Sequence, residues 1–431
     1  MWELILSTHY DTLTLDDRGA VAGEDYDLGG TTMKDMLLKE AKALQPMLQD
    51  FRREIHKNPE TGFDLVHTKA MVKQALEDMG YEPQDCGKAG VVVTVGGKKP
   101  GKVFLLRADM DALPLPDETD YEYKSQIPGK MHACGHDMHA TMLMGAAKLL
   151  KEHEDEIEGT IKLMFQPAEE IFAGAEDMIN NGVLENPKPD AAMMIHVAIG
   201  SDHKGGTFVV PTPGISMASV DQYVITVKGK GGHGSTPHLA VDPITAAAHI
   251  HLALQEINSR EINGHDFAVF TTCMVRAGET FNVIPEFAEM SGTIRTLDGS
   301  GQIADYIRKR IEEIAKGVGA AMRCDVDVKF PIHGLALVVD EQVSACAETY
   351  MTELAGEDYV YMNSVPSNGS EDFALVSHAI PSINVDLVVG SKADGYELYV
   401  HNPKSSFDDQ YLWKGTAGYA YMAMRWLAEH K

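Results

Sequence analysis

The run VFLLRA at residues 103–108 decides the fold class, because this short apolar segment predicts a strand that ends in the acidic residues Asp109 and Asp111. Two further apolar runs end in groups that bind metals: TIKLMF (160–165) before Glu169-Glu170, and AAMMI (191–195) before His196. Helical spacing between the first two runs makes strands and helices alternate, which favours an α/β fold with a doubly wound sheet. In such sheets, residues that follow separate strands meet in the crevice beyond the carboxyl ends.

On the N-terminal side, apolar residues from Met33 to Lys57 recur at intervals of three and four, which predicts an amphipathic helix stopped by Asn58-Pro59. A second helix is predicted over residues 69–79, where Gly80 ends it. The strand-like run VVVTV (91–95) is separated from VFLLRA only by GGKKPGK. We therefore expect these two strands to form a hairpin.

From residue 216 the pattern changes to strand, helix, strand, strand, helix, strand, in the segments 223–229, 243–258, 267–275, 288–296, 301–319 and 323–330. This βαββαβ order is the ferredoxin-like arrangement. We expect a catalytic α/β domain made of residues 33–215 and 333–431, interrupted by an α+β unit over residues 216–332, here called the insert. Residues 1–32 are expected to form a loose N-terminal extension.

Composition excludes several classes of function. A formal net charge of −27 argues against nucleic-acid and anionic-membrane partners, because the long-range field repels phosphate. The five cysteines form no CxxC pair, which fits a reducing compartment. Residues 1–30 lack the regions of a signal peptide, and no run approaches the roughly 18 apolar residues of a membrane span. We therefore expect a cytoplasmic protein.

The segment HACGHDMH (132–139) supplies candidate metal ligands. A turn at Gly135 that runs into a helix would let Cys134 and His136 face one crevice, and a thiolate with an imidazole suits a borderline-soft ion such as zinc. The alternative is structural, because a lone Cys is often a small buried hydrophobe and a lone His is often satisfied by hydrogen bonds.

The tandem pair Glu169-Glu170 predicts hydrolytic chemistry. Adjacent carboxylates point in different directions, so one can ligate a cation while the other acts as general base on the water that the cation polarises. The structural alternative is a solvated helix start, where the macrodipole favours acids. His196 has the same placement at a strand end, and the convergence of these groups favours a metal centre.

Two other classes of enzyme remain open. GKGGHG (229–234) matches the GxGxxG fingerprint of dinucleotide sites, but the following strand ends in Arg276 instead of an acid. We expect that match to be accidental and the glycines to give His233 room to project. A cysteine hydrolase that uses Cys134 and a neighbouring histidine would leave the glutamate pair idle.

Taken together, the motifs resemble the M20 metallopeptidase family, specifically the amidohydrolase branch with hippurate hydrolases and auxin-amino-acid conjugate hydrolases. The resemblance runs from Met33 to the C-terminus. The matching segments are RRxxHxxPE (52–60), RADMDALP (107–114), MHACGHDMH (131–139), FQPAEE (165–170), IHV (195–197), GKGGHGSTPH (229–238), FNVIP (281–285) and GTIRT (292–296).

The resemblance implies a site for two divalent ions, with zinc, manganese and cobalt as candidates, in which Cys134 bridges the ions and Glu169 is the general base. The implied ligands are Cys134, His136, Glu170, His196 and His401. The insert is implied to be a lid and dimerisation domain, which predicts a homodimer or a higher homo-oligomer.

In the same resemblance, His233 stabilises the oxyanion, in some relatives from the other subunit. Asn282 and Arg295 match positions that bind the carbonyl and the carboxylate of the substrate. The implied activity is metal-dependent hydrolysis of small N-acyl amino acids. The alternatives are a carboxypeptidase or dipeptidase that acts on free-amine peptides, and a metal-binding protein without catalysis.

Overall fold

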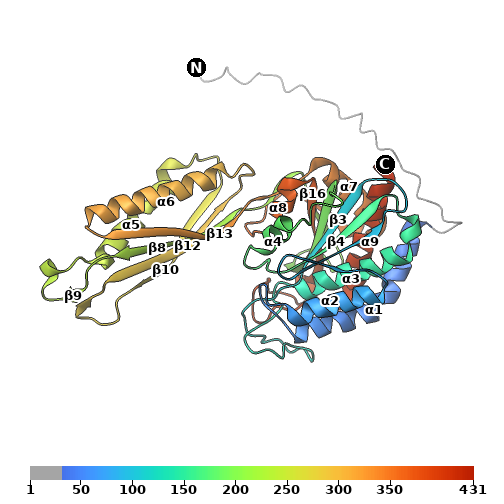
Figure 1. Ribbon diagram of the computed structural model, residues 1–431, viewed down its shortest axis with the longest axis horizontal. Helices are drawn as coiled ribbons and strands as arrows, with labels where there is room; N and C mark the ends of the chain where they lie inside the picture. Colours follow the sequence, from blue (N-terminus) through green and yellow to red (C-terminus); the bar gives the residue numbers. More distant parts are fainter. Residues whose placement is uncertain (1–31) are drawn as a thin grey trace, which may run out of the picture.

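The computed structural model describes residues 32–431, so the predicted extension over residues 1–32 lies outside the described residues except for Thr32. Two separate hydrophobic cores organise this part of the chain (Figure 1). The smaller core is formed by residues between Tyr223 and Val326, and the larger core draws on residues before and after them. No helix of the described residues combines the length and the apolar content needed to cross a membrane.

The larger core surrounds a mixed eight-stranded sheet, so the α/β class is confirmed. In order across the sheet, its strands are β1 (Gln84–Cys86), β2 (Gly90–Gly96), β4 (Thr160–Gln166), β3 (Val103–Asp109), β5 (Ala191–Ser201), β16 (Ser382–Ser391), β6 (Phe208–Pro211) and β15 (Val360–Asn363). The strand β3 is parallel to both of its neighbours, and every one of its residues is buried.

The predicted hairpin between residues 91–95 and 103–108 is wrong. The strand β4 lies between β2 and β3, antiparallel to the first and parallel to the second. A strand that is buried on both faces needs a partner on each side, and the crossover from β3 through a helix brings β4 into that position.

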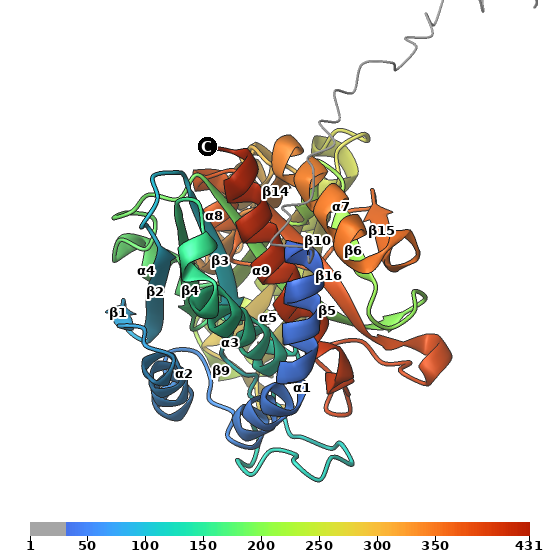
Figure 2. The same cartoon turned by 90° about the vertical axis from the view of Figure 1, so that its right-hand side faces the viewer.

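Helices cover both faces of the sheet. In Figure 2, one layer in front of the sheet contains α1 (Met33–Lys57), α3 (His136–Glu152), α7 (Glu341–Ala355) and α9 (Leu412–Glu429), with α2 (Val66–Asp78) beside it. The short helices α4 (Gly174–Asn180) and α8 (Ala374–Ala379) lie on the side that faces the insert in Figure 1. The predicted first helix matches α1 at both ends, and its side-chain cap is Thr32, which accepts a hydrogen bond from the backbone of Asp35.

The smaller core belongs to the insert, whose elements follow the predicted βαββαβ order. They are β8 (Val220–Lys228), α5 (Pro243–Glu256), β10 (Ala268–Ala277), β12 (Phe287–Thr296), α6 (Gln302–Ala321) and β13 (Asp325–Gly334). The strands form an antiparallel sheet in the order β10-β12-β8-β13. At the end away from the large sheet, β9 (Gly232–His233) pairs with β11 (Val283–Ile284) (Figure 1). The strand β7 (Gly214–Met217) pairs with β14 (Leu337–Val339).

The hydroxyl of Tyr419 lies between the central strands β3 and β5, at the point where these strands stop pairing with each other. The pairing of β3 with β5 runs as far as Arg107 opposite Met194. The Tyr419 hydroxyl of α9 then donates to the Arg107 carbonyl at 2.7 Å and accepts from the Ile195 amide at 2.8 Å. These backbone groups are buried and need partners, so the hydroxyl satisfies both as the two strands part.

We predict that Tyr419→Phe lowers the free energy of unfolding by about 1–3 kcal/mol, because it leaves a buried carbonyl and a buried amide without their partner. Denaturant titration of the metal-free protein measures the change. The matched control is Tyr306→Phe on the insert, whose hydroxyl contacts Glu261 at the exposed surface at 3.1 Å. Equal stability of the two variants would contradict the role of Tyr419.

Candidate metal centre

The turn before α3 brings the first two candidate ligands to the crevice, as predicted. Gly135 adopts a left-handed conformation with φ 92°, and a Cβ atom there would lie 2.3 Å from Val197 Cγ2. Only glycine fits both conditions. The helix α3 begins at the next residue, so Cys134 and His136 lie on either side of the turn and point toward the same space.

All five implied ligands converge there. Cys134 Sγ lies 3.5 Å from His196 Nε2 and 3.2 Å from His401 Nε2. Glu170 Oε1 lies 3.4 Å from His401 Nε2 and 3.8 Å from His136 Nε2. Ligand atoms at ~2.1 Å from a tetrahedral cation are separated by about 3.4 Å, so these spacings fit a metal site.

The donor atoms fall into overlapping groups, each of which could hold one ion. Two of them share Cys134: Cys134, His136 and His196 in one, and Cys134, Glu170 and His401 in the other. A thiolate can ligate more than one cation, so Cys134 would be available to an ion held by either group.

Buried polar atoms without hydrogen-bond partners support the interpretation of this place as a cation site. Both ring nitrogens of His136 and Oε1 of Glu170 are buried without a hydrogen-bond partner among the described residues. Buried polar atoms in native proteins nearly always have partners, and a divalent ion would supply one to each. Sulfur, nitrogen and oxygen donors together suit zinc, manganese or cobalt.

Glu169 lies beside the ligands without belonging to the two groups that share Cys134. Its Oε2 lies 3.9 Å from His136 Nε2, and the side chain is buried. Burial raises the pKa of Glu169 well above its ordinary value, and Glu371 and Glu170 raise it further. A carboxyl group in this environment is suited to taking up and releasing a proton.

The acids Asp109 and Asp111 hold the ligands in place, a role that their position at a strand end left open. The two oxygens of Asp111 accept hydrogen bonds from the backbone amides of Glu169 and Glu170, at 3.0 and 3.3 Å. Asp109 contacts His139 Nδ1 at 2.6 Å. His139 Nε2 accepts a hydrogen bond from the Val197 amide at 2.9 Å, so both nitrogens of that ring are engaged. His139 therefore orients the neighbourhood of His196 and is not free to bind a metal.

A buried guanidinium joins the acids behind Glu169. Arg107 contacts Asp109 at 2.6 Å, Glu371 at 2.8 Å and Asp372 at 3.0 Å. Asp372 also accepts hydrogen bonds from Gln166 and from the Ala175 amide. Sequence reasoning noted the segment Ser370-Glu371-Asp372-Phe373 only as a loop, because no local pattern links it to residue 107.

The first helix fixes the other side of the turn. Arg52 Nε and His56 Nδ1 lie 2.6 and 2.8 Å from Asp137 Oδ2, and all three side chains are buried. Asp137 directly follows His136, so α1 anchors the residue next to a ligand. This contact gives a physical role to the RRxxHxxPE motif.

His401 enters the site from a strained loop. It has φ 63°, an uncommon value for a residue other than glycine, and its amide donates to the Ala133 carbonyl at 2.8 Å. The side chain is 50% exposed, so His401 lies at the open side of the site. Strain of this kind persists where the surrounding contacts determine the conformation.

Three predicted residues of the insert lie apart from the ligands. His233 lies on β9 and Asn282 directly precedes β11, and both are exposed; β9 lies at the end of the insert away from the large sheet (Figure 1). Arg295, on β12, reaches the large domain, where its Nη1 donates to the Ser370 hydroxyl. Within one chain the structure therefore places Arg295 next to the acidic loop and does not bring His233 to the ligands.

Charges within the site set the protonation of the metal-free ligands. Burial and Glu170 oppose ionisation of Cys134, but His136 and His196 outweigh them and lower the pKa of the thiol to about 6. Burial alone would lower the pKa of His196, but Cys134 raises it to about 9. The proximity of Cys134 and Glu170 raises the pKa of His401 to about 10.

The chain matches the model of peptidase family M20/M25/M40 over residues 105–425. It is 37% identical to a hippurate hydrolase of Campylobacter jejuni, covering 91% of this chain and 99% of that protein. It is 36% identical to the IAA-amino acid hydrolase ILR1-like 5 of Arabidopsis thaliana, covering 88% and 86%. A dinuclear metal binding peptidase from Bacillus subtilis has a similar structure, with a TM-score of 0.73, 32% identity, and coverage of 90% and 99%.

We predict that divalent cations bind with release of protons and that their affinity rises with pH. An imidazole must be neutral to bind a metal. The pKa values of His196 and His401 are raised to about 9 and 10, so at pH 7 both rings carry a proton that the cation must displace. Below pH 6 the Cys134 thiol also becomes protonated, which steepens the loss of affinity. Calorimetry in buffers of different ionisation enthalpy measures the number of protons released. An affinity that is independent of pH between 6 and 8 would contradict the assignment of His196 and His401 as metal ligands.

Proposed function

The chain belongs to peptidase family M20/M25/M40, and from this we propose that it hydrolyses the amide bond of small N-acyl amino acids with Glu169 as general base. The observation that carries the proposal is a buried carboxylate with a raised pKa beside two ligand groups that share Cys134. A purely structural metal site needs no such additional acid.

The names of the relatives support this class of substrate. Both the hippurate hydrolase and the IAA-amino acid hydrolase are named for compounds in which an acyl group is joined to an amino acid by an amide bond. The ligands proposed for a pair of divalent ions are Cys134, His136, Glu170, His196 and His401. When bound, the ions would polarise the substrate carbonyl and the attacking water.

In the proposed reaction, Glu169 takes a proton from the attacking water and later gives it to the leaving amine. His233 would donate a hydrogen bond to the developing oxyanion. Its Nδ1 accepts from the Ser235 amide at 3.1 Å, so the proton of a neutral ring lies on Nε2, which is then the donor. Asn282 would hold the substrate carbonyl.

Arg295 would bind the carboxylate of the substrate. It lies at the junction between the insert and the acidic loop, next to Ser370. Its guanidinium supplies local positive charge in a chain whose net charge is −27, and a fixed fork of donors matches a carboxylate.

We propose that residues 216–332 form the lid and dimerisation domain, with a ferredoxin-like fold, and that residues 33–215 and 333–431 form the catalytic domain. Because His233 lies far from the ligands of its own chain, we propose that it serves the site of a second copy. The edge strand β10 and exposed apolar residues of the insert, such as Phe281 and Leu252, offer a surface for pairing.

A product-release screen tests the substrate class. Purified protein is analysed for its metals and then supplied with N-acetyl, N-benzoyl and indole-acyl amino acids and with simple dipeptides. Cleavage of the N-acyl amino acids supports the proposal. Preference for dipeptides would assign a dipeptidase, and cleavage of nothing by the metal-loaded protein would favour a binding protein.

We predict that Glu169→Gln lowers kcat by at least about 100-fold while metal content stays unchanged, because the amide cannot accept the proton of the attacking water. Elemental analysis and amide-hydrolysis assays measure the two effects separately. The matched variant is Glu170→Gln, which removes a proposed ligand and should lower metal content as well. Full turnover by Glu169→Gln would refute the base assignment.

We predict that His233→Ala loses about 100- to 1,000-fold in kcat, as expected for one oxyanion donor. If His233 acts on the site of a second copy, co-refolding or co-expression of His233→Ala with Glu169→Gln restores activity, because one site of each mixed dimer has both groups intact. Inactive mixtures with demonstrated mixed dimers would show that both residues act within one chain.

A further inference from the structure

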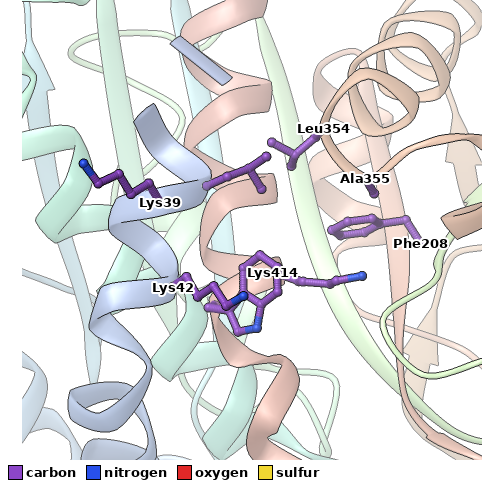
Figure 3. A pocket seen from close by; sticks show the side chains of 8 residues that line it. Lys39, Lys42, Phe208, Leu354, Ala355 and Lys414 are labelled. Carbon is purple, nitrogen blue, oxygen red and sulfur yellow. The ribbon is translucent and has the colours of Figure 1, made fainter. Parts of the chain in front are cut away.

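A cavity lies away from the metal centre, between the helical layer and the sheet. Its volume is about 370 Å³, within the range of small-molecule sites. Side chains of α1, α7, α9 and β6 surround it (Figure 3). None of its lining residues belongs to the groups of possible metal ligands.

The interior of this cavity is apolar. Its apolar lining residues include Leu38 of α1, Phe208 of β6, Leu354 of α7 and Trp413 of α9. Ala355 lies beside Leu354 (Figure 3). Such a lining favours a ligand with an aliphatic or aromatic body, because burying apolar surface is the main source of affinity in a pocket of this kind.

Lysines line the same cavity. Lys39 and Lys42 project from α1 and Lys414 from α9, and within residues 32–431 no carboxylate forms an ion pair with any of them. The Lys42 ammonium lies 5.7 Å from the centre of the Trp413 ring. In a chain with 64 acidic and 37 basic residues, a group of lysines without acidic partners is unexpected.

No carboxylate of the described residues forms an ion pair with Lys414. Its ammonium lies 3.8 Å from the centre of the Tyr359 ring, and that of Lys204 lies 3.9 Å from the same ring. Burial and repulsion from Lys204 lower the pKa of Lys414 to about 8. The Gly206 carbonyl accepts one hydrogen bond from Lys414 at 3.1 Å, which leaves donors for an anion.

We propose that this cavity binds a small monocarboxylate with an apolar body, which places its hydrocarbon part against Leu38, Leu354 and Trp413 and its carboxylate toward Lys42 and Lys414. Each lysine ammonium is a single point charge, unlike the planar guanidinium of arginine, which can bind both oxygens of a carboxylate. The interior of the cavity offers no further polar groups. The complementary ligand therefore carries one negative charge at one end. This site does not depend on the amide-hydrolysing function.

Calorimetric titration of the full chain with octanoate tests the proposal. Octanoate is expected to bind, whereas acetate lacks the apolar body and octylammonium has the opposite charge, so neither should bind. Lys42→Met and Lys414→Met should each weaken octanoate binding by about tenfold, as for loss of one charged contact. Lys309→Met, an exposed lysine on the insert, is the matched control and should leave the affinity unchanged.

Ala355→Trp fills the cavity and should abolish octanoate binding while the midpoint of denaturant unfolding stays near that of the unchanged chain, which shows that the variant is folded. Carboxylates also bind metals, so the titration is repeated with Glu170→Gln. Binding that disappears in Glu170→Gln and persists in Ala355→Trp would place octanoate at the metal centre and overturn the proposal. Two other results would overturn it: binding only after residues 1–31 are removed, or a loss of oligomeric mass in Ala355→Trp, which would assign the surface to a second copy.

Discussion

The buried guanidinium of Arg107 is the interaction on which the candidate site depends. It contacts Asp109, Glu371 and Asp372, and no other arginine or lysine among residues 32–431 forms an ion pair with these acids. Burial raises the pKa of Asp372 to about 8 even with Arg107 beside it. Carboxylates taken out of water repel one another, so without this cation the loop before α8 would leave the sheet. Because Glu169 lies against the same group of acids, its environment and the position of the loop have a common origin.

From this centre, support reaches the ligands through neighbouring hydrogen bonds. Asp109 links Arg107 to His139, whose ring in turn holds the Val197 amide next to His196. Asp111 holds the backbone of both glutamates, and Tyr419 ties α9 to the strands on either side of the crevice. Of the proposed ligands, His196 thus rests on the strand β5 and His136 on the start of α3, which suits a metal site because coordination tolerates little displacement.

The sequence was sufficient where the determinants are local. The helix Met33–Lys57 follows from apolar periodicity and a stopping Asn-Pro, and the placement of Cys134 and His136 follows from the turn at Gly135. The expectation that His196 follows the end of its strand was wrong, because β5 continues to Ser201 by pairing with β16. Sequence reasoning failed where the interacting residues are far apart along the chain. Arg107 and Glu371 are 264 residues apart, and nothing in either segment identifies the other. The hairpin prediction failed for the same reason, because strand order depends on a crossover and not on the length of the connecting loop. His401 was identified only through the family resemblance, since its loop has no periodic pattern.

The large domain and the insert differ in how far their parts of the proposed catalytic site are already in place. The ligands and Glu169 are preorganised within one core, whereas His233 lies in a ladder with Val283 beside Phe281, which is fully exposed. Burying Phe281 against another surface would contribute about 1.5–3 kcal/mol, and Val283 and Phe287 would add to it. The same contact would exclude water from the crevice and deliver the oxyanion donor. Association that hides this apolar tip would therefore provide free energy to assemble the proposed catalytic site, so a proposed oxyanion donor and a proposed base could lie on separate domains.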